Sequence, residues 1–185
     1  MTYGSDTGGY SGFAKLLHWV IAACVLVLIP VGILIVWVDL GPWGDTLFNL
    51  HKSFGVLVLI LVLIRVLYRL MHGAPAPDPN LDAFRRAASG TVHTLLYILL
   101  VVQPILGYAA NSAYGAATPF FGLFEISPLL AKNEALSDQL FMYHRWIGMA
   151  LAVLLAVHIG AALQHYFIRR DDVLQRMLPR AMGGA

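Results

Sequence analysis

The chain has 185 residues, of which 59% are apolar and 12% are charged, and its formal net charge is +2. Soluble domains carry about 25% charged residues, and a soluble domain of this size still exposes roughly 30% of the surface of its unfolded chain. A soluble enzyme and a nucleic-acid-binding protein are therefore excluded, and a small integral membrane protein remains. The single cysteine, Cys24, excludes an internal disulfide, a cysteine-based zinc site and the CxxCH attachment of a c-type haem.

Four segments are long and apolar enough to cross a bilayer as helices, which takes about 20 residues each. They cover about residues 13–38, 46–71, 88–110 and 138–168. The sequence thus predicts an all-α fold, an integral membrane four-helix bundle, as a single membrane domain over residues 1–185 with no separate soluble domain. The third connection, about residues 111–137, is long and apolar, and we interpret it as a segment lying on the membrane surface.

Lysine and arginine are distributed unevenly between the two ends of the predicted spans. Nine lie on the side of the termini and the second connection: Lys15, Arg65, Arg69, Arg85, Arg86, Arg169, Arg170, Arg176 and Arg180. The opposite side has three, which are Lys52, Lys132 and Arg145. Because cytoplasmic loops carry the excess of Lys and Arg, this distribution predicts that both termini are cytoplasmic.

Six of the seven histidines lie in or at the ends of the spans, where a polar side chain needs a partner. His144 and His158 are 14 residues apart in the fourth span. This spacing is a rise of roughly 21 Å and nearly four helical turns, so both project from almost the same face at two depths. His18 can meet His158 toward the cytoplasm, and His51 can meet His144 toward the outside. Two such pairs are what two stacked bis-histidine b-type haems need, since haem iron takes axial ligands on both faces.

Other residues on these helical faces favour haem over bare histidine pairs. Gly32 and Gly107 each follow a span histidine by 14 residues, and glycine lets backbone approach a neighbouring helix or a flat macrocycle closely. Arg65 follows His51 by 14 residues, which makes it a natural ion-pair partner for a haem propionate at the cytoplasmic depth.

Four further residues are candidates for substrate or proton chemistry. Lys52 and Arg145 each adjoin a candidate ligand on the outer side, where they could pair with a propionate or receive an anion. His93 lies near the cytoplasmic start of the third span, and His165 follows His158 by seven residues, about 10 Å nearer the cytoplasm. A quinone or proton-relay role and a plain interfacial histidine both stay open for His93 and His165.

The same residues also have alternative interpretations that involve no haem. The span histidines could be hydrogen-bonded packing residues or members of a proton path. A zinc ion or other bare metal is disfavoured because the two pairs lie too far apart to share one ion. Gly32 and Gly107 could be ordinary helix-packing glycines.

Three stretches resemble the bacterial cytochrome b561 family, whose members are small four-helix di-haem b cytochromes of the inner membrane. They are AKLLHW at 14–19, LHKSFGVLVLILVLIRVLYRL at 50–70 and MYHRWIGMALAVLLAVHIGAALQHYFIRRDDVLQRMLP at 142–179. The last is the most specific because it joins both fourth-span histidines to the RDDVLxRMLP tail. The resemblance implies His18 with His158 on a cytoplasmic haem b, and His51 with His144 on a periplasmic haem b.

The same resemblance implies a function. A member of this family acts as a superoxide oxidase, which takes electrons from superoxide on the periplasmic side and passes them to ubiquinone, with protons from the cytoplasm. Lys52 and Arg145 would then attract the superoxide anion, while His165 and His93 would serve the quinone or its protons. The expected cofactors and partners are two non-covalent haem b groups, ubiquinone, superoxide and the lipid bilayer, in a multi-pass protein of the bacterial inner membrane.

Two rival functions remain. The chain could be a membrane electron-transfer subunit that links a redox protein partner, such as a dehydrogenase or hydrogenase, to the quinone pool. Phe120, Phe121 and Phe124 of the apolar third connection would then form a docking surface. A haem-free channel or proton-coupled transporter is disfavoured by the matched histidine pairs.

Overall fold

Four long helices dominate the computed structural model, which describes residues 9–76 and 82–178. They are α1 (Gly12–Trp37), α2 (Gly44–His72), α3 (Ala83–Tyr114) and α4 (Glu134–Gln164). Each is long and apolar enough to cross a membrane, which confirms the predicted all-α membrane fold. All four helices begin before the predicted spans, and in α1, α3 and α4 the start is a polar cap that lies outside the apolar window. The side chains of Ser11, Asp82 and Asn133 accept hydrogen bonds from backbone N–H groups in the first turns of α1, α3 and α4.

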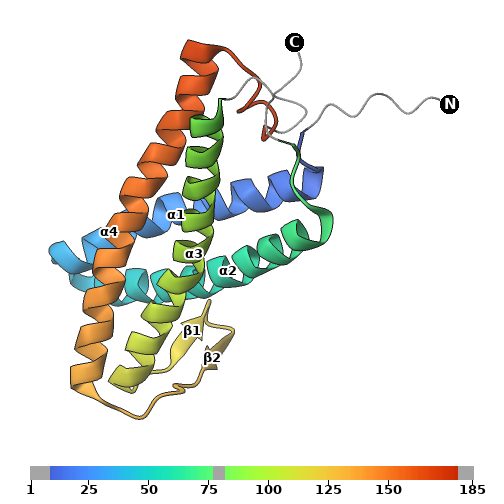
Figure 1. The fold of residues 1–185 in the computed structure, drawn as a ribbon. Coiled ribbons are helices and arrows are strands. Elements are labelled where there is room, and N and C mark those ends of the chain that lie inside the picture. Colours follow the sequence, from blue (N-terminus) through green and yellow to red (C-terminus); the bar gives the residue numbers. More distant parts are fainter. Residues whose placement is uncertain (1–8, 77–81, 179–185) are drawn as a thin grey trace.

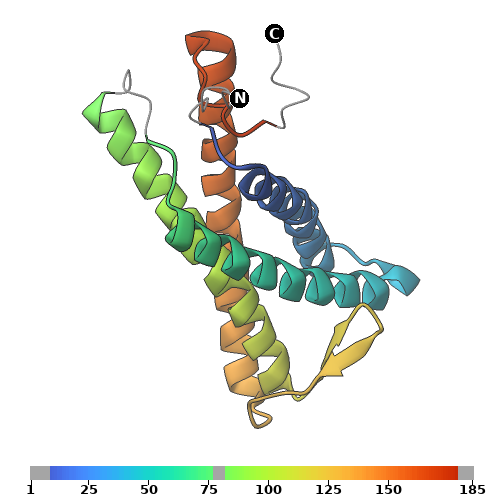
Figure 2. The ribbon, with the colours of Figure 1, turned by 90° about the vertical axis from the view of Figure 1, so that its right-hand side faces the viewer.

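The helices form two hairpins that cross rather than run parallel (Figures 1 and 2). The short 3₁₀ helix η1 (Gly41–Trp43) joins α1 to α2, and α3 packs along α4. Ile21 and Val25 of α1 pack with Val58 and Val62 of α2 in the buried core, and partly buried residues of α3 and α4, such as Val101 and Leu155, pack against it. Many other large apolar side chains face outward, as expected for surfaces that contact lipid.

The third connection contains a small β-hairpin that the sequence interpretation did not include. Strands β1 (Thr118–Phe120) and β2 (Phe124–Ile126) pair in antiparallel register, with Phe120 opposite Phe124. The buried hydroxyl of Ser53 in α2 accepts the N–H of Phe121 at 3.0 Å, and its one proton is shared between the carbonyls of Asn49 at 2.9 Å and Pro119 at 3.0 Å. The hairpin is thereby tied to α2 (Figure 2).

The described C-terminal end returns to the beginning of α1. The π-helical turn η2 (His165–Arg169) ends α4, and residues 171–178, here called the C-terminal strap, fold back beside the start of α1 (Figure 1). Tyr10, Lys15 and Trp19 donate hydrogen bonds to backbone carbonyls of the strap at 2.8 to 3.2 Å. Arg180, one of the nine basic residues of the predicted cytoplasmic side, lies outside the described residues.

Candidate cofactor sites

One pair of histidines faces across α2 and α4 at the end of the molecule that carries the β-hairpin. The ring centres of His51 and His144 are 6.2 Å apart, with planes at 83°. We call this pair the hairpin-side layer. His144 Nδ1 donates to the backbone carbonyl of Gln103 at 3.0 Å, and the Gln103 side chain donates to the carbonyl of His144 at 2.7 Å. Because a carbonyl only accepts, this bond fixes the proton of His144 on Nδ1 and leaves Nε2 with a free lone pair.

Three histidines meet nearer the C-terminal strap, and we call them the strap-side layer. The ring centres of His18 and His158 are 6.3 Å apart, and those of His93 and His158 are 5.3 Å apart. His93 also hydrogen-bonds through Nδ1 to the carbonyl of Ser89 at 2.8 Å. The structure therefore brings His93 into contact with His158 of the predicted pair, a contact that the sequence did not predict.

The geometry of the two predicted pairs fits a bis-imidazole iron site. Two imidazoles bound to opposite faces of one iron, with metal–nitrogen bonds of about 2 Å, have ring centres roughly 6 Å apart. The separations of 6.2 Å for His51–His144 and 6.3 Å for His18–His158 match this spacing, whereas the 5.3 Å of His93–His158 is shorter. In addition, His51 Nδ1 is buried with no hydrogen-bond partner among the described residues.

Two glycines make room for the hairpin-side imidazoles. A Cβ atom added to Gly32 would lie 3.0 Å from Cε1 of His51, and one added to Gly107 would lie 2.9 Å from Cε1 of His144. Both glycines thus lie at the depth of the hairpin-side layer. Their nearest neighbours are the histidine rings themselves.

Apolar material separates the two layers. The buried core residues of α1 and α2 follow His18 and His51 along their helices, so this core lies between the two depths. Between α1 and α4 there is also an apolar cavity of about 200 Å³, with Pro30 and Leu155 among its lining residues. Apolar side chains therefore separate the two histidine layers.

The predicted cations occupy different settings. The ammonium group of Lys52 lies 4.5 Å from the centre of the Phe48 ring, and the carboxylates of Asp45 and Glu125 are close enough to interact with it. Arg145 is exposed at the surface.

Arg65 lies at the strap-side layer, close enough to His18 to interact with it electrostatically. Its Nε donates to the Tyr97 hydroxyl at 3.1 Å, and its Nη1 donates to the carbonyl of Ala14. Arg65 thus lies at the depth of His18 and His158, where the sequence predicts a partner for a haem propionate.

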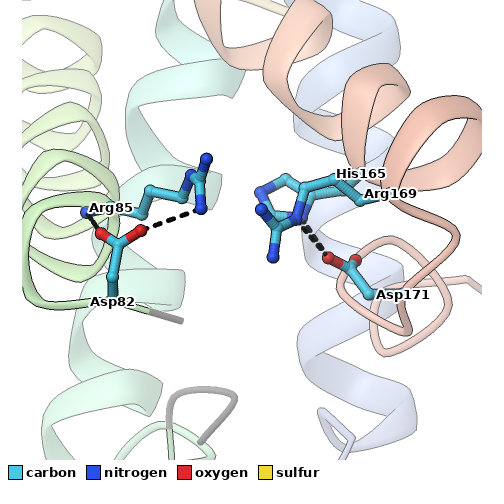
Figure 3. A network of polar contacts seen from close by, with 5 residues as sticks. All are labelled: Asp82, Arg85, His165, Arg169 and Asp171. Carbon is cyan, nitrogen blue, oxygen red and sulfur yellow. Dashed lines mark hydrogen bonds and ion pairs between the residues drawn. The ribbon is translucent and has the colours of Figure 1, made fainter. Parts of the chain in front are cut away.

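His165 belongs to a polar network at the end of α4 (Figure 3). Its Nδ1 is 2.6 Å from Oδ2 of Asp171, which also accepts a hydrogen bond from Nε of Arg169 at 3.0 Å. Burial raises the pKa of Asp171, but the hydrogen bonds from His165 and Arg169 outweigh it, and the pKa lies below its ordinary value. Within the described part of the chain, no hydrogen bond or ring contact joins His165 to His93.

Gln103 and Asp171 were not among the residues predicted for the site. Gln103 is a polar residue inside an apolar span, which by itself marks it as needing a partner. Asp171 belongs to the tail motif, but its position in the sequence does not indicate that a π-helical turn brings it back to His165.

Known proteins match this chain over most of its length. Residues 9–180 match the family model described as prokaryotic cytochrome b561. Cytochrome b561 homolog 2 of Escherichia coli is 32% identical over 98% of this chain and 97% of its own length. Cytochrome b561 homolog 1 of the same organism is 30% identical over 89% and 93%. A protein of Yersinia pestis named probable superoxide oxidase CybB is 29% identical over 77% of this chain and 78% of its own length.

Proposed function

The chain belongs to the prokaryotic cytochrome b561 family, and from this membership we propose that it carries electrons from superoxide, through two b-type haems, to ubiquinone. Membership makes it a multi-pass b-type cytochrome of the inner membrane with a role in electron transport. We propose in addition that the number of haems is two, that the electron donor is superoxide and that the acceptor is ubiquinone. The observation that carries it is the presence of two facing histidine pairs, 6.2 and 6.3 Å apart, at two depths of α4.

In this proposal each pair would hold one haem by its iron: His51 with His144, and His18 with His158. A bound haem would contribute reversible one-electron chemistry, with a potential tuned by its ligands and surroundings. The protein holds the imidazoles apart, fixes the His144 tautomer through Gln103, and separates the two layers with apolar side chains. Arg65 provides a positive charge for a propionate of the strap-side haem.

Superoxide would be collected at the hairpin-side layer. Superoxide is a small anion, and a cationic surface raises the local concentration and arrival rate of anions. Lys52 and Arg145 directly follow His51 and His144 in the sequence, so two positive charges lie near the hairpin-side layer. Asp45 and Glu125 moderate the charge of Lys52, and exposed Arg145 is therefore the stronger attractant. The name of the Yersinia relative supports superoxide as the donor.

Ubiquinone would be reduced near the strap-side layer. Two superoxide anions give up one electron each and become two molecules of oxygen, while one quinone takes the two electrons and two protons to become quinol. Histidine is the side chain suited to proton transfer near neutral pH. His165, oriented by the Asp171 carboxylate at 2.6 Å, is assigned to proton uptake from the cytoplasm. His93 lies beside His158 and is assigned to the quinone side.

The membrane orientation is part of the same proposal. The strap side carries most of the basic residues and is assigned to the cytoplasm, which puts the β-hairpin and Arg145 in the periplasm. Protons for quinol would then come from the cytoplasm, and superoxide from the periplasm.

The proposal is tested with the purified haem-loaded protein, an enzymatic source of superoxide and a soluble ubiquinone analogue. We expect haem reduction that begins with the superoxide source, stops on addition of a dismutase, and is followed by quinol formation. His144→Ala is expected to lose one of the two haems from the reduced-minus-oxidised spectrum, whereas His72→Ala, at the end of α2, retains both. An unchanged two-haem spectrum in His144→Ala would contradict the ligand assignment, and the absence of reduction by superoxide would contradict the donor.

A second function is favoured by one observation. Leu123 and Phe124 at the tip of the β-hairpin are 77% and 56% exposed, and Phe120 stacks on Phe124. This apolar tip could receive a partner dehydrogenase or hydrogenase, with the chain serving as its membrane electron-transfer subunit. Normal haem content combined with no response to superoxide would favour this function, and replacement of Phe124 by Ser should then weaken partner binding.

A further inference from the structure

A polar cavity of about 250 Å³ lies where the start of α1, the end of α2 and the middle of α3 meet. Its lining includes Ser11, Arg65, Tyr68, Arg69, His72 and Tyr97. We call it the arginine cavity. The β-hairpin, the superoxide-side cations and the His165 network contribute nothing to it. It shares Arg65 with the strap-side layer, whereas Arg69 belongs to the cavity and has no role in the proposed electron transfer.

The charges of the cavity suit an anion. Two guanidinium groups line it, and no Asp or Glu does so among the described residues. Arg65 already donates to Tyr97 and to the carbonyl of Ala14. Arg69 lies over the Tyr97 ring at 5.7 Å, but it has no carboxylate or hydrogen-bond acceptor in the described chain for its guanidinium donors. A guanidinium with free donors is well matched to the oxygens of a phosphate.

Hydroxyl and ring groups complete the cavity wall. The Ser11 and Tyr68 hydroxyls are 2.9 Å apart, and the His72 ring stacks on Tyr68 with centres 4.1 Å apart. The N-terminal end of α1, which carries the positive end of the helix dipole, begins at Gly12 beside Ser11. These groups offer further donors around Arg69 without adding negative charge.

The surroundings indicate where the anion would come from. Phe13, whose ring contacts Tyr68, is 46% exposed, and Leu70 and Met71 next to Arg69 are 78% and 71% exposed. Cationic donors next to outward-facing apolar side chains at the end of a membrane helix correspond to the level where lipid headgroups meet acyl chains. A free phosphate ion would use only the cavity, whereas a phospholipid would use the cavity and these apolar surfaces.

We propose that the arginine cavity binds the phosphate group of an anionic phospholipid, such as phosphatidylglycerol, from the leaflet on the strap side. Arg69 is the principal ligand, with Arg65 and the Ser11–Tyr68 hydroxyls around it. The site is independent of the electron donor and acceptor proposed above. A quinone headgroup is uncharged and gains little from two cations, which makes it the weaker fit.

The test is native mass spectrometry of the detergent-purified, haem-loaded protein titrated with phosphatidylglycerol, phosphatidylcholine or inorganic phosphate. We expect phosphatidylglycerol to be retained in preference to phosphatidylcholine. Arg69→Gln should weaken its binding about tenfold or more, which corresponds to about 1.4 kcal/mol. Arg69→Lys, which keeps the charge but not the planar fork, should restore part of the affinity. The matched control is Arg85→Gln, because Arg85 is a basic residue of the same end that pairs with Asp82 away from the cavity.

Each outcome decides the proposal. Selective weakening in Arg69→Gln, with Arg85→Gln like the wild type, supports it. Equal binding in the two glutamine variants contradicts it, provided that both variants keep the wild-type haem spectrum. Should Arg69→Gln lose that spectrum, the comparison of Arg69→Lys with Arg85→Gln takes its place. Binding of inorganic phosphate with no preference for phosphatidylglycerol would overturn the lipid source, and displacement of the lipid by a ubiquinone analogue would assign the cavity to quinone.

Discussion

At the scale of single residues, the hairpin-side imidazoles depend on the absence of side chains at two positions. Gly32 and Gly107 approach the rings of His51 and His144 so closely that a Cβ atom would be only 3.0 and 2.9 Å away. The His144 ring cannot easily move aside because Gln103 holds its Nδ1. Any side chain at residue 107 therefore has to displace the ring or the helix.

Gly107→Ala is accordingly expected to lower haem content by disturbing His144. The measurement is the haem-to-protein ratio together with the reduced-minus-oxidised spectrum of the purified variant. Gly55→Ala is the matched control, because a Cβ atom at Gly55 has no neighbour within 4 Å. Alanine in a helix interior is favoured over glycine by about 0.5–1 kcal/mol, so this control should retain its haem. Full haem content with an unshifted spectrum in Gly107→Ala would mean that the close approach is unimportant.

Asp171 is the residue that joins α4 to the C-terminal strap. Its carboxylate accepts hydrogen bonds from His165 and Arg169, and its other oxygen accepts the N–H of Val173 at 3.3 Å. The titratable and charged groups that contact this carboxylate are His165 and Arg169, which both belong to η2. These three hydrogen bonds tie the end of the helix to the strap, and screening by solvent keeps the contribution of each below that of a buried charged pair.

Asp171→Asn should therefore loosen the strap. Amide hydrogen exchange over residues 173–178 is expected to speed up about tenfold, the equivalent of about 1.4 kcal/mol. The control is Asp172→Asn, because no side-chain contact of Asp172 is present in the described chain. Equal protection in the two variants would show that the carboxylate does not hold the strap.

The strap also has a predicted pH dependence. Since the pKa of Asp171 is lower in the folded protein than its ordinary value of 3.8, its contribution is complete above that ordinary value. The contribution is lost as the pH falls through the lowered pKa. Exchange of the strap amides, corrected for intrinsic rates, should therefore increase in this acid range in the wild type. In Asp171→Asn this component should be absent.

At the scale of secondary-structure elements, a single hydroxyl connects the β-hairpin to α2. Ser53 is 2% exposed and serves both Pro119 and Phe121 of the hairpin. The Phe121 ring adds an edge contact with Phe54 at 4.9 Å. Ser53 and Phe54, the two residues that follow Lys52, therefore hold the hairpin against the N-terminal part of α2, close to His51.

Ser53→Ala should release the hairpin. Loss of the hydroxyl leaves the Pro119 carbonyl and the Phe121 N–H without this partner, at a cost of about 1–3 kcal/mol for a buried group. Limited proteolysis between residues 118 and 126 should become faster, whereas Ser127→Ala, on an exposed position of the same connection, should match the wild type. If both variants are cleaved at the wild-type rate, the Ser53 tie does not fix the hairpin.

At the scale of the whole molecule, the basic residues predict an orientation that can be measured. In a Cys24→Ala background, the variant Lys132→Cys should react with a membrane-impermeant maleimide added to intact spheroplasts. The variant Asp172→Cys should react only after the cells are opened. The reverse pattern would place the strap and His165 in the periplasm and would contradict proton uptake from the cytoplasm.

The membrane fold was predictable from sequence because it depends on regular features. Apolar windows define the four spans, and 14-residue spacing puts His144 and His158 on one face of α4 whatever the remaining packing. The β-hairpin was not predictable, since its strands are three residues long and lie in an apolar stretch. The contacts of Gln103 and Asp171 depend on helix register and on the π-helical turn. Spacing along a single helix cannot specify either.

Both facing pairs draw one histidine from α4, the last of the four long helices to be synthesised. His18 and His51 therefore leave the ribosome long before His158 and His144 exist. Until α4 has entered the membrane, neither facing pair has its second imidazole, and the strap that returns to α1 has not been made. Completion of the two sites is thus a late event in biogenesis. A chain that stops before residue 134 would insert three helices yet possess neither histidine pair.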